Sequence, residues 1–167
     1  LDERVNQSGF VLEPKIDGLT VVLHYENGIF VKGATRGDGE VGEDITTNLR
    51  TIRALPLRIP LSDNGSRVPQ HLVVRGEVFI LSKDFIELNN NLEEAGERTY
   101  QNPRNTAAGS LRQLDQELTR QRPLTLFTYA IVHSSERVAD TQWGTLEVLR
   151  KYGFPVSDLS EFRETFQ

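Results

Sequence analysis

The sequence contains no cysteine and no methionine, and it has a single tryptophan. The lack of cysteine excludes a disulfide framework and a zinc site built on thiolates. No apolar run approaches the roughly 20 residues that a membrane-spanning helix needs, and no signal-peptide pattern is present. We therefore expect a protein that has no membrane partner.

Positive charge is also scarce, because 19 lysines and arginines face 24 acidic residues and leave a formal net charge of -5. Proteins that hold DNA through many phosphates usually carry a basic face. The acidic balance argues against strong DNA binding by this chain alone, although its cations could still gather locally. Its 167 residues, of which 37% are hydrophobic, suit one domain with a core of its own.

Hydrophobic patterning predicts a chain of mixed strands and helices, and hence an α+β fold. Asn27-Gly28 separates two strand-like runs and is a strong signal for a tight β-hairpin turn. The expected strands cover residues 10–16, 19–25, 29–35, 72–80 and 124–132. The first expected helix is short and buries Ile45, Leu49 and Ile52. The second covers residues 82–95, with Ser82 as its N-cap and with Phe85, Leu88 and Leu92 facing inward. Further helices are expected over 106–114, over 141–152 and from Asp158 onward.

A lysine flanked by two carboxylates stands in the first expected strand. Side chains alternate along a strand, which places Glu13, Lys15 and Asp17 on one face, just before a glycine that can bend the chain. Lysine is a nucleophile only as the neutral amine, which burial or neighbouring cations favour. The simpler alternative is an exposed edge strand with solvated charges.

Two later strands also carry candidate residues with open alternatives. Glu77 interrupts an otherwise apolar strand, which costs solvation unless the carboxylate is exposed or paired, and an Arg75–Glu77 pair on a wet face would explain it equally well. Tyr129 shares a predicted face with Phe127 and Ile131, and a core tyrosine is an equally good interpretation.

Taken together, several motifs give a more specific indication. Lys15-Ile16-Asp17-Gly18 resembles the nucleotidyltransferase signature of DNA ligases, RNA ligases and capping enzymes. In order and spacing, the whole set resembles the adenylation domain of bacterial NAD-dependent DNA ligases, from residue 10 to residue 157. The further motifs are Ala34-Thr35-Arg36-Gly37-Asp38-Gly39, Gly42-Glu43-Asp44-Ile45-Thr46, Arg75-Gly76-Glu77-Val78-Phe79, Asn102-Pro103-Arg104-Asn105 and Ala107-Ala108-Gly109-Ser110-Leu111-Arg112-Gln113-Leu114-Asp115.

This resemblance implies a nucleotidyltransferase fold (ATP-grasp-like), with mostly antiparallel sheets and packed helices, and a role for each matching residue. Lys15 would attack the α-phosphate of NAD, release nicotinamide mononucleotide and carry AMP, which then passes to the 5′-phosphate of nicked double-stranded DNA. Asp17 would assist the lysine. Glu13 matches a residue near the adenine edge, Glu77 one that binds the ribose hydroxyls or a metal, and Tyr129 the aromatic that stacks on adenine.

Three arginines match phosphate-binding positions of the same family. Arg36 matches a residue at the ribose and the nicked strand, and Arg104 and Arg112 match residues that contact the DNA phosphate and AMP. The planar guanidinium suits this work because it can meet a phosphate with two hydrogen bonds. Asp38 is a further candidate for supporting Arg36 or a metal. The implied cofactors are NAD and Mg²⁺, with Zn²⁺ only in a module that lies outside this sequence.

The resemblance also implies neighbours that the sequence does not contain. We expect residues 1–167 to be a single partial adenylation domain, without the N-terminal helical domain that binds nicotinamide mononucleotide and without the C-terminal OB-fold, zinc, helix-hairpin-helix and BRCT parts. Such an enzyme works in DNA replication and repair, in the bacterial cytoplasm near the nucleoid, and we expect this segment not to ligate DNA alone. The alternatives are an ATP-dependent relative, which the stretches 34–48 and 102–115 fit less well, and a non-catalytic nucleotide-binding module.

Overall fold

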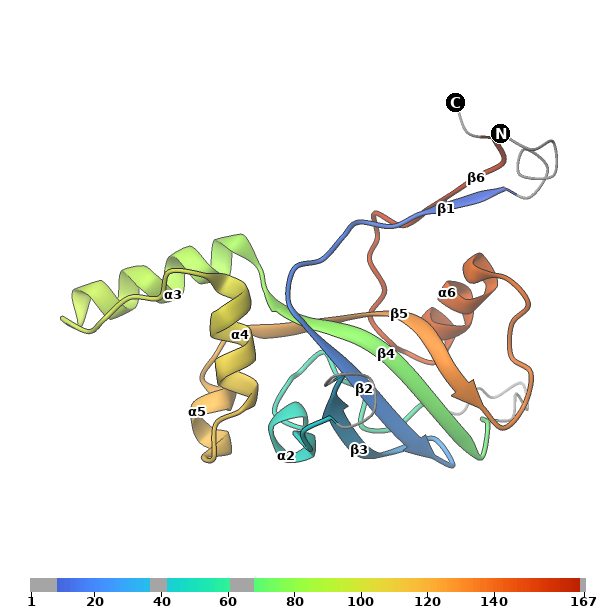
Figure 1. Cartoon of the computed structure of the whole chain (residues 1–167), viewed down its shortest axis with the longest axis horizontal. Helices are drawn as coiled ribbons and strands as arrows, with labels where there is room; N and C mark the ends of the chain where they lie inside the picture. The colour runs from blue at the N-terminus through green and yellow to red at the C-terminus, as the bar shows by residue number, and fades with distance from the viewer. Residues whose placement is uncertain (1–8, 37–41, 61–67, 166–167) are drawn as a thin grey trace.

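A four-stranded antiparallel sheet forms the centre of the molecule (Figure 1). The computed structural model describes residues 9–36, 42–60 and 68–165. The sheet order is β3-β2-β4-β5, and the predicted α+β fold with antiparallel sheets is confirmed. Its strands are β2 (Leu19–Glu26), β3 (Ile29–Thr35), β4 (His71–Ile80) and β5 (Leu124–Ser134).

Five helices lie around this sheet in the described part of the chain. Helix α6 packs beside β5, α2 lies against β3, and α3, α4 and α5 gather near the end of the sheet where β4 leaves it (Figure 1). The helices are α2 (Thr46–Leu49), α3 (Ser82–Glu94), α4 (Pro103–Leu111), α5 (Gln116–Arg120) and α6 (Gln142–Lys151).

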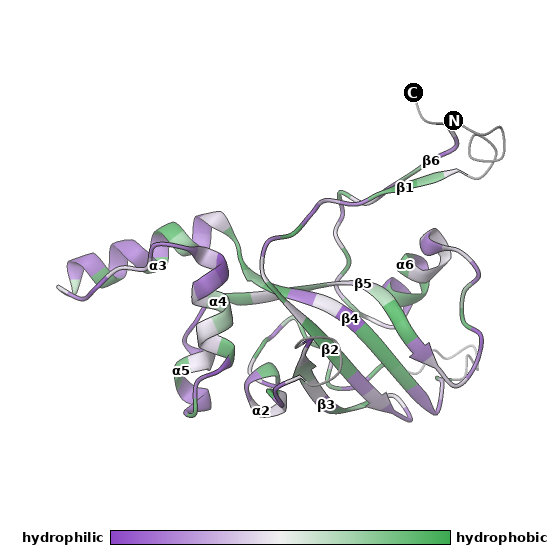
Figure 2. Cartoon of the chain, in the orientation of Figure 1, coloured by the Kyte–Doolittle hydropathy of each residue, from purple (hydrophilic) through white to green (hydrophobic). Residues whose placement is uncertain are grey.

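One face of the sheet carries the hydrophobic core. Val21, Leu23 and Tyr25 of β2 alternate with more exposed residues and are almost fully buried against side chains of α2 and α6. The alternation of green and purple along β2 and β4 in Figure 2 follows the same two-residue period. The other face carries half-buried residues such as Thr20 and Glu77, and the candidate site lies there.

The predicted hairpin turn is confirmed. Asn27 and Gly28 both have positive φ angles, 49° and 77°, which a type I′ turn requires at its two central residues. The turn joins β2 to β3 as antiparallel neighbours, so the lysine segment leads directly into the sheet.

The predictions for residues 10–16 and for the segment from Asp158 were wrong. The strand expected over residues 10–16 ends early, as β1 (Phe10–Leu12), and residues 13–17 form no helix or strand. Pro14 has no amide hydrogen to give to a ladder, which limits the strand. The helix expected from Asp158 is instead β6 (Glu161–Arg163), which pairs with β1 in a separate two-stranded sheet.

The prediction for α3 was wrong in its packing. Its N-cap is Leu81 rather than Ser82, and Phe85, Leu88 and Leu92 are only half-buried, since no residue of α3 is buried. The helix extends away from the sheet in Figure 1. It is tied to the segment that follows it by Asn89, whose side chain makes two 2.8 Å hydrogen bonds to the backbone of Tyr100.

Helices α2 and α4 form as the sequence predicts, with shifted bounds. Ile45, Leu49 and Ile52 are buried as expected, although α2 covers only one turn between them. Helix α4 begins three residues before the predicted start because Asn102 caps it, with its side-chain oxygen accepting from the Asn105 amide. It ends at Leu111, and α6 also forms as predicted, with Gly153 ending it at φ 79°.

Candidate active site

The lysine segment, residues 13–17, crosses from β1 to β2 as an irregular stretch fixed at its far end. Gly18 is buried, and a Cβ atom there would lie 2.2 Å from the Val78 carbonyl oxygen, so only glycine fits against β4. Glu13, Lys15 and Asp17 are exposed while Pro14 and Ile16 are half-buried. Exposure therefore alternates along residues 13–17 as predicted, although these residues do not form the predicted strand.

Four of the predicted residues line one cavity, which we call the lysine pocket. Glu13, Lys15, Glu77 and Tyr129 surround a space of about 280 Å³. This volume lies just below the range of about 300–1,000 Å³ that is typical of small-molecule sites. The rest of its wall includes Phe127, Thr128, Ser157 and Ser160. Among the residues described, Lys15 forms no hydrogen bond or ion pair, so none of them occupies its amine.

Glu77 is held by the strand beside it. Thr20 lies directly opposite on β2, and its hydroxyl donates a 2.9 Å hydrogen bond to Glu77 Oε2. Within the described part of the chain no Arg75–Glu77 ion pair forms, and Arg75 Nε is buried without a partner. The alternative of a paired, wet strand face is therefore wrong, and the second carboxylate oxygen of Glu77 remains available at the pocket.

A β-bulge places Tyr129 at the pocket. Opposite Arg75 and Gly76 of β4 stand Ala130 and Thr128, so Tyr129 is the extra residue of β5. A bulge of this kind redirects side chains, and Ile131 consequently packs on the hydrophobic core instead of sharing the face of Tyr129 as predicted. Burial, and secondarily the charge of Glu77, raises the pKa of Tyr129, while a hydrogen bond with Thr20 opposes the rise. The phenol therefore stays neutral at physiological pH.

The three predicted arginines meet at a second cavity, the arginine pocket. Arg36, Arg104 and Arg112 surround about 530 Å³ of space together with Thr20 and Glu43. Because Thr20 also binds Glu77, the arginine pocket adjoins the lysine pocket. The sequence motifs that carry these arginines are thus brought to one place beside the lysine segment. Asp38, the weaker candidate for supporting Arg36, lies outside the described residues.

Two of these arginines hold acidic residues in place. Arg104 Nη1 lies 3.0 Å from Asp17 Oδ1, and Arg112 Nε lies 2.5 Å from Glu43 Oε2. All four side chains are about half exposed or more, so these pairs contribute little stability. Their effect is geometric: Arg104 orients Asp17, two residues from Lys15, while both guanidinium groups keep further N–H donors beyond these pairs.

Helix α4 positions both arginines from its buried side. Ala107 and Leu111 are fully buried, which fixes the rotation of the helix and turns residues 104 and 112 toward the pocket. Asn48 holds the end of the helix, because its amide group donates to the carbonyl oxygens of Leu111 at 2.7 Å and Gln113 at 2.8 Å.

Sequence reasoning missed several residues at the site. Gln142 at the start of α6 donates 2.9 Å hydrogen bonds both to Glu13 Oε2 and to the Tyr129 carbonyl, so it links two walls of the lysine pocket. Thr20 could have been found from strand alternation, since it lies on the face of β2 opposite to the buried Val21 and Leu23. Ser157 and Ser160 also line the pocket; Ser160 comes from a segment predicted as helix, and no sequence signal marked either residue.

The arrangement suits covalent transfer of a phosphorylated group. It offers an accessible amine, an aromatic ring and carboxylates around one cavity, and arginines around the next. Across the described ranges no cluster of three or more His, Cys, Asp or Glu residues could by itself hold a metal ion. These features are the ones that a nucleotidyl-transfer site needs.

Comparison with known proteins agrees with this class. Residues 2–167 match the family described as the NAD-dependent DNA ligase adenylation domain. The chain belongs to this family. It is 52% identical over 159 residues to a DNA ligase of Gluconacetobacter diazotrophicus, covering 95% of this chain and 22% of that protein. DNA ligases of Brucella anthropi and Roseiflexus castenholzii are each 50% identical, over 93% and 96% of this chain and 21% and 23% of theirs.

The chain therefore spans about a fifth of the length of the curated relatives it matches. The predicted resemblance, the fold it implied and the homology to NAD-dependent DNA ligases are confirmed. Among the described residues, no helix has the length and apolar character to cross a membrane.

Proposed function

We propose that this chain is the core of an NAD-dependent DNA ligase that takes up AMP on Lys15. The neutral Nζ attacks the α-phosphorus of NAD, the P–O bond to nicotinamide mononucleotide breaks, and that group leaves with the electron pair while Nζ loses a proton. The observation that carries the proposal is the lysine pocket, where Lys15 lines the same cavity as Glu77 and Tyr129.

The pocket walls suggest a division of labour around the nucleotide. Tyr129 offers a neutral aromatic ring for stacking on adenine. Such stacking is favourable because the ring and the base are both flat and aromatic. Glu13, held by Gln142, would accept from the adenine edge, and Glu77 would accept from the ribose hydroxyls through the oxygen that Thr20 leaves free.

The arginine pocket would hold phosphate oxygens while the lysine reacts. Arg36 lines this pocket and has no side-chain ion pair with any residue in the described ranges. Arg104 and Arg112 keep free donors beyond their bonds to Asp17 and Glu43. Cations at this point stabilise the negative charge on the oxygens around the phosphorus during the transfer.

A magnesium ion fits this site only with substrate present. Mg²⁺ commonly takes one or two carboxylates plus substrate phosphates, and Glu77 provides one carboxylate next to the place proposed for the phosphates. When bound, the ion would neutralise phosphate charge. We propose Glu77 as its protein ligand, in which case the free carboxylate oxygen would bind the ion in place of the ribose hydroxyls.

The AMP would then pass to the 5′-phosphate of nicked double-stranded DNA. We propose that residues 1–167 form one partial adenylation domain and that parts outside this sequence, including a helical domain for nicotinamide mononucleotide and an OB-fold, complete the enzyme. Nick sealing by these 167 residues alone would contradict this proposal.

The test is the intact mass of the protein after incubation with NAD and magnesium, with ATP in parallel and Lys15→Ala as control. We expect a gain of one AMP from NAD and none in the variant. If these 167 residues gain nothing, a protein extended at both ends is tested in the same way. AMP gained only from ATP would indicate the ATP-dependent branch, and AMP retained by Lys15→Ala would refute Lys15 as nucleophile.

A further inference from the structure

Ser160 carries a buried hydroxyl group that forms no hydrogen bond with any other described residue. Buried polar groups in folded proteins almost always have a partner, so each exception requires an explanation. Within the described ranges, the buried serines and threonines are Thr35, Thr106, Ser110, Thr119, Thr128, Ser157 and Ser160. In all of these except Ser160, the hydroxyl forms a hydrogen bond with a backbone group.

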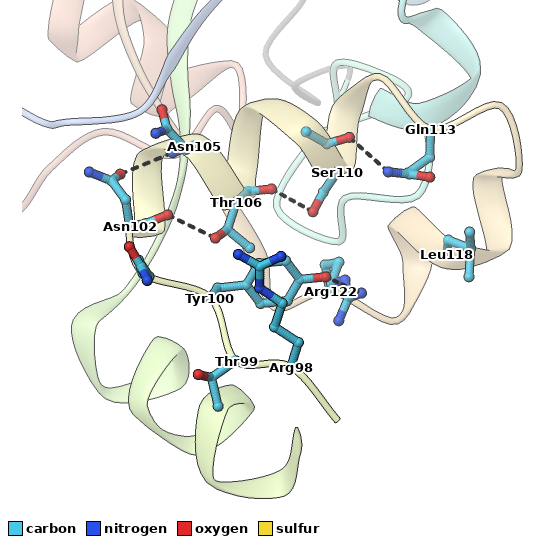
Figure 3. Close-up of a pocket in the computed structure, with 12 residues that line it drawn as sticks. Arg98, Thr99, Tyr100, Asn102, Asn105, Thr106, Ser110, Gln113, Leu118 and Arg122 are labelled. Carbon is cyan, nitrogen blue, oxygen red and sulfur yellow. Dashed lines mark hydrogen bonds between the residues drawn. The ribbon is translucent and has the colours of Figure 1, made fainter. Parts of the chain in front are cut away.

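Figure 3 shows such pairing at a cavity of about 680 Å³ beside α4. Thr106 donates to the carbonyl oxygen of Asn102 at 2.8 Å, and Ser110 donates to the carbonyl oxygen of Thr106 at 2.7 Å. The hydrogen of each hydroxyl is therefore already used inside the helix. These two buried hydroxyls require no ligand to explain them, in contrast to Ser160.

The unpaired hydroxyl of Ser160 lies at the lysine pocket. Ser160 is one of the residues that line this cavity, and only 7% of its surface is exposed. Among the described residues, the side-chain polar atom that is both fully enclosed and unpaired is Arg75 Nε, so the hydroxyl oxygen of Ser160 is not sealed inside the protein. The wall of the pocket thus offers a hydroxyl donor that the free protein does not use.

The backbone of Ser160 is held in place before any ligand binds. The Thr128 amide and hydroxyl both donate to the carbonyl oxygen of Pro155, at 2.7 and 3.0 Å, which ties this segment to β5. Ser157 then forms a tight turn, because its hydroxyl oxygen accepts from the Leu159 amide and its carbonyl oxygen accepts from the Ser160 amide, both at 3.2 Å. A group fixed in this way loses less entropy when it binds a ligand.

The chemistry of the pocket indicates which ligand atom such a donor would serve. Glu13 and Glu77 are carboxylates, which accept hydrogen bonds, and the hydroxyl hydrogen of Thr128 is used by Pro155. The adenine ring, in contrast, has acceptors at its nitrogens N1, N3 and N7. Enclosing an acceptor without a donor costs free energy, so a base in this pocket needs a donor from the wall.

We propose that the Ser160 hydroxyl donates a hydrogen bond to a ring nitrogen of the adenine of NAD. Ser160 is then a substrate-binding residue that complements Glu13, since the carboxylate accepts from the base and the hydroxyl donates to it. This inference rests on the proposed function, and it adds a contact from a segment that lies outside the sequence motifs.

The test uses a full-length ligase that carries these 167 residues, with Ser160→Ala as the variant. The kinetics of AMP attachment are measured with NAD and with three analogues in which carbon replaces N1, N3 or N7 of adenine. Loss of one hydrogen bond is expected to raise the KM for NAD about two- to tenfold with little change in kcat. With one of the three analogues, the unmodified ligase should show the same rise and Ser160→Ala should add no further loss, as a double-mutant cycle requires for a direct contact.

Ser82→Ala is the matched control, because Ser82 is exposed at the start of α3, which extends away from the sheet in Figure 1. Its KM for NAD should equal that of the unmodified ligase. The melting temperature of Ser160→Ala should not fall, since the hydroxyl has no partner among the described residues, whereas a structural serine would lower it when replaced.

An unchanged KM in Ser160→Ala would overturn the inference. So would an equal penalty of the substitution with all three analogues, because the hydroxyl would then contact none of the ring nitrogens. Absence of AMP attachment in the unmodified ligase would instead refute the proposed function.

Discussion

Replacing Gly18 by alanine tests whether the contact of the lysine segment with β4 positions the nucleophile. The added Cβ would lie 2.2 Å from the Val78 carbonyl oxygen and 2.9 Å from Phe79 Cβ. Neither atom is the end of a flexible side chain, so the backbone of residues 16–19 must move away from β4.

The expected cost is that of overpacking a well-packed contact, about 1–3 kcal/mol. For a domain of this size, each kcal/mol lowers the melting temperature by about 2–4 °C, so a decrease of roughly 2–12 °C is expected. Lys15 lies three residues away, and a displacement of about 1 Å at a reacting group can reduce the rate about 100-fold. We therefore expect AMP attachment to slow by about this factor.

The assay is the rate of AMP attachment followed by intact mass, with the melting temperature measured on the same preparations. Gly109→Ala is the matched control, because the same methyl group enters open space in a helix and should raise stability by up to about 1 kcal/mol. If Gly18→Ala keeps both its melting temperature and its rate of AMP attachment, the argument that this glycine fixes the lysine segment is refuted.

Two further predictions follow from buried or bridging side chains. Burial raises the pKa of Tyr25 far above its ordinary value of 10, so the contribution of the neutral phenol to stability is complete below pH 10 and is lost as pH rises beyond that. We expect the free energy of unfolding, measured by denaturant titration, to fall above pH 10 and to fall less steeply in Tyr25→Phe. Equal slopes in the two proteins would contradict this. Gln142→Ala removes the bonds to Glu13 and to the Tyr129 carbonyl, each worth about 1 kcal/mol. It should therefore raise the KM for NAD roughly five- to thirtyfold with little change in kcat, and a fall in kcat alone would argue against a role in nucleotide binding.

Local sequence patterns predicted the elements whose stability is local. The strands of the central sheet follow from alternation of apolar residues such as Val21 and Leu23, and the hairpin follows from Asn27-Gly28. Helix α6 follows from Thr141, whose hydroxyl caps it, and from Gly153, which ends it. In each case the residues that decide the structure lie within a few positions of one another.

Contacts between distant segments were beyond these patterns. The pairing of β1 with β6 joins residues about 150 positions apart, and three-residue strands carry too little pattern to be recognised. The bulge that redirects Tyr129 depends on the register of β5 against β4, which the sequence of β5 alone does not state. The apolar stripe of α3 suggested burial, yet the helix lies beside the segment at Tyr100 and not on the sheet.

The sequence by itself determined the family of this protein and the identity of its candidate residues. The reason is that the motifs around Lys15, Glu77 and Arg104 are recognised from the residue types and their order along the chain. Only the tertiary structure decided that these residues share two adjoining pockets, that Gln142 and Thr20 hold them there, and that Ser160 joins the lysine pocket. The reason is physical: a side chain's type is set by the chain, whereas its neighbours are set by the register, the bulge and the packing that bring distant segments together.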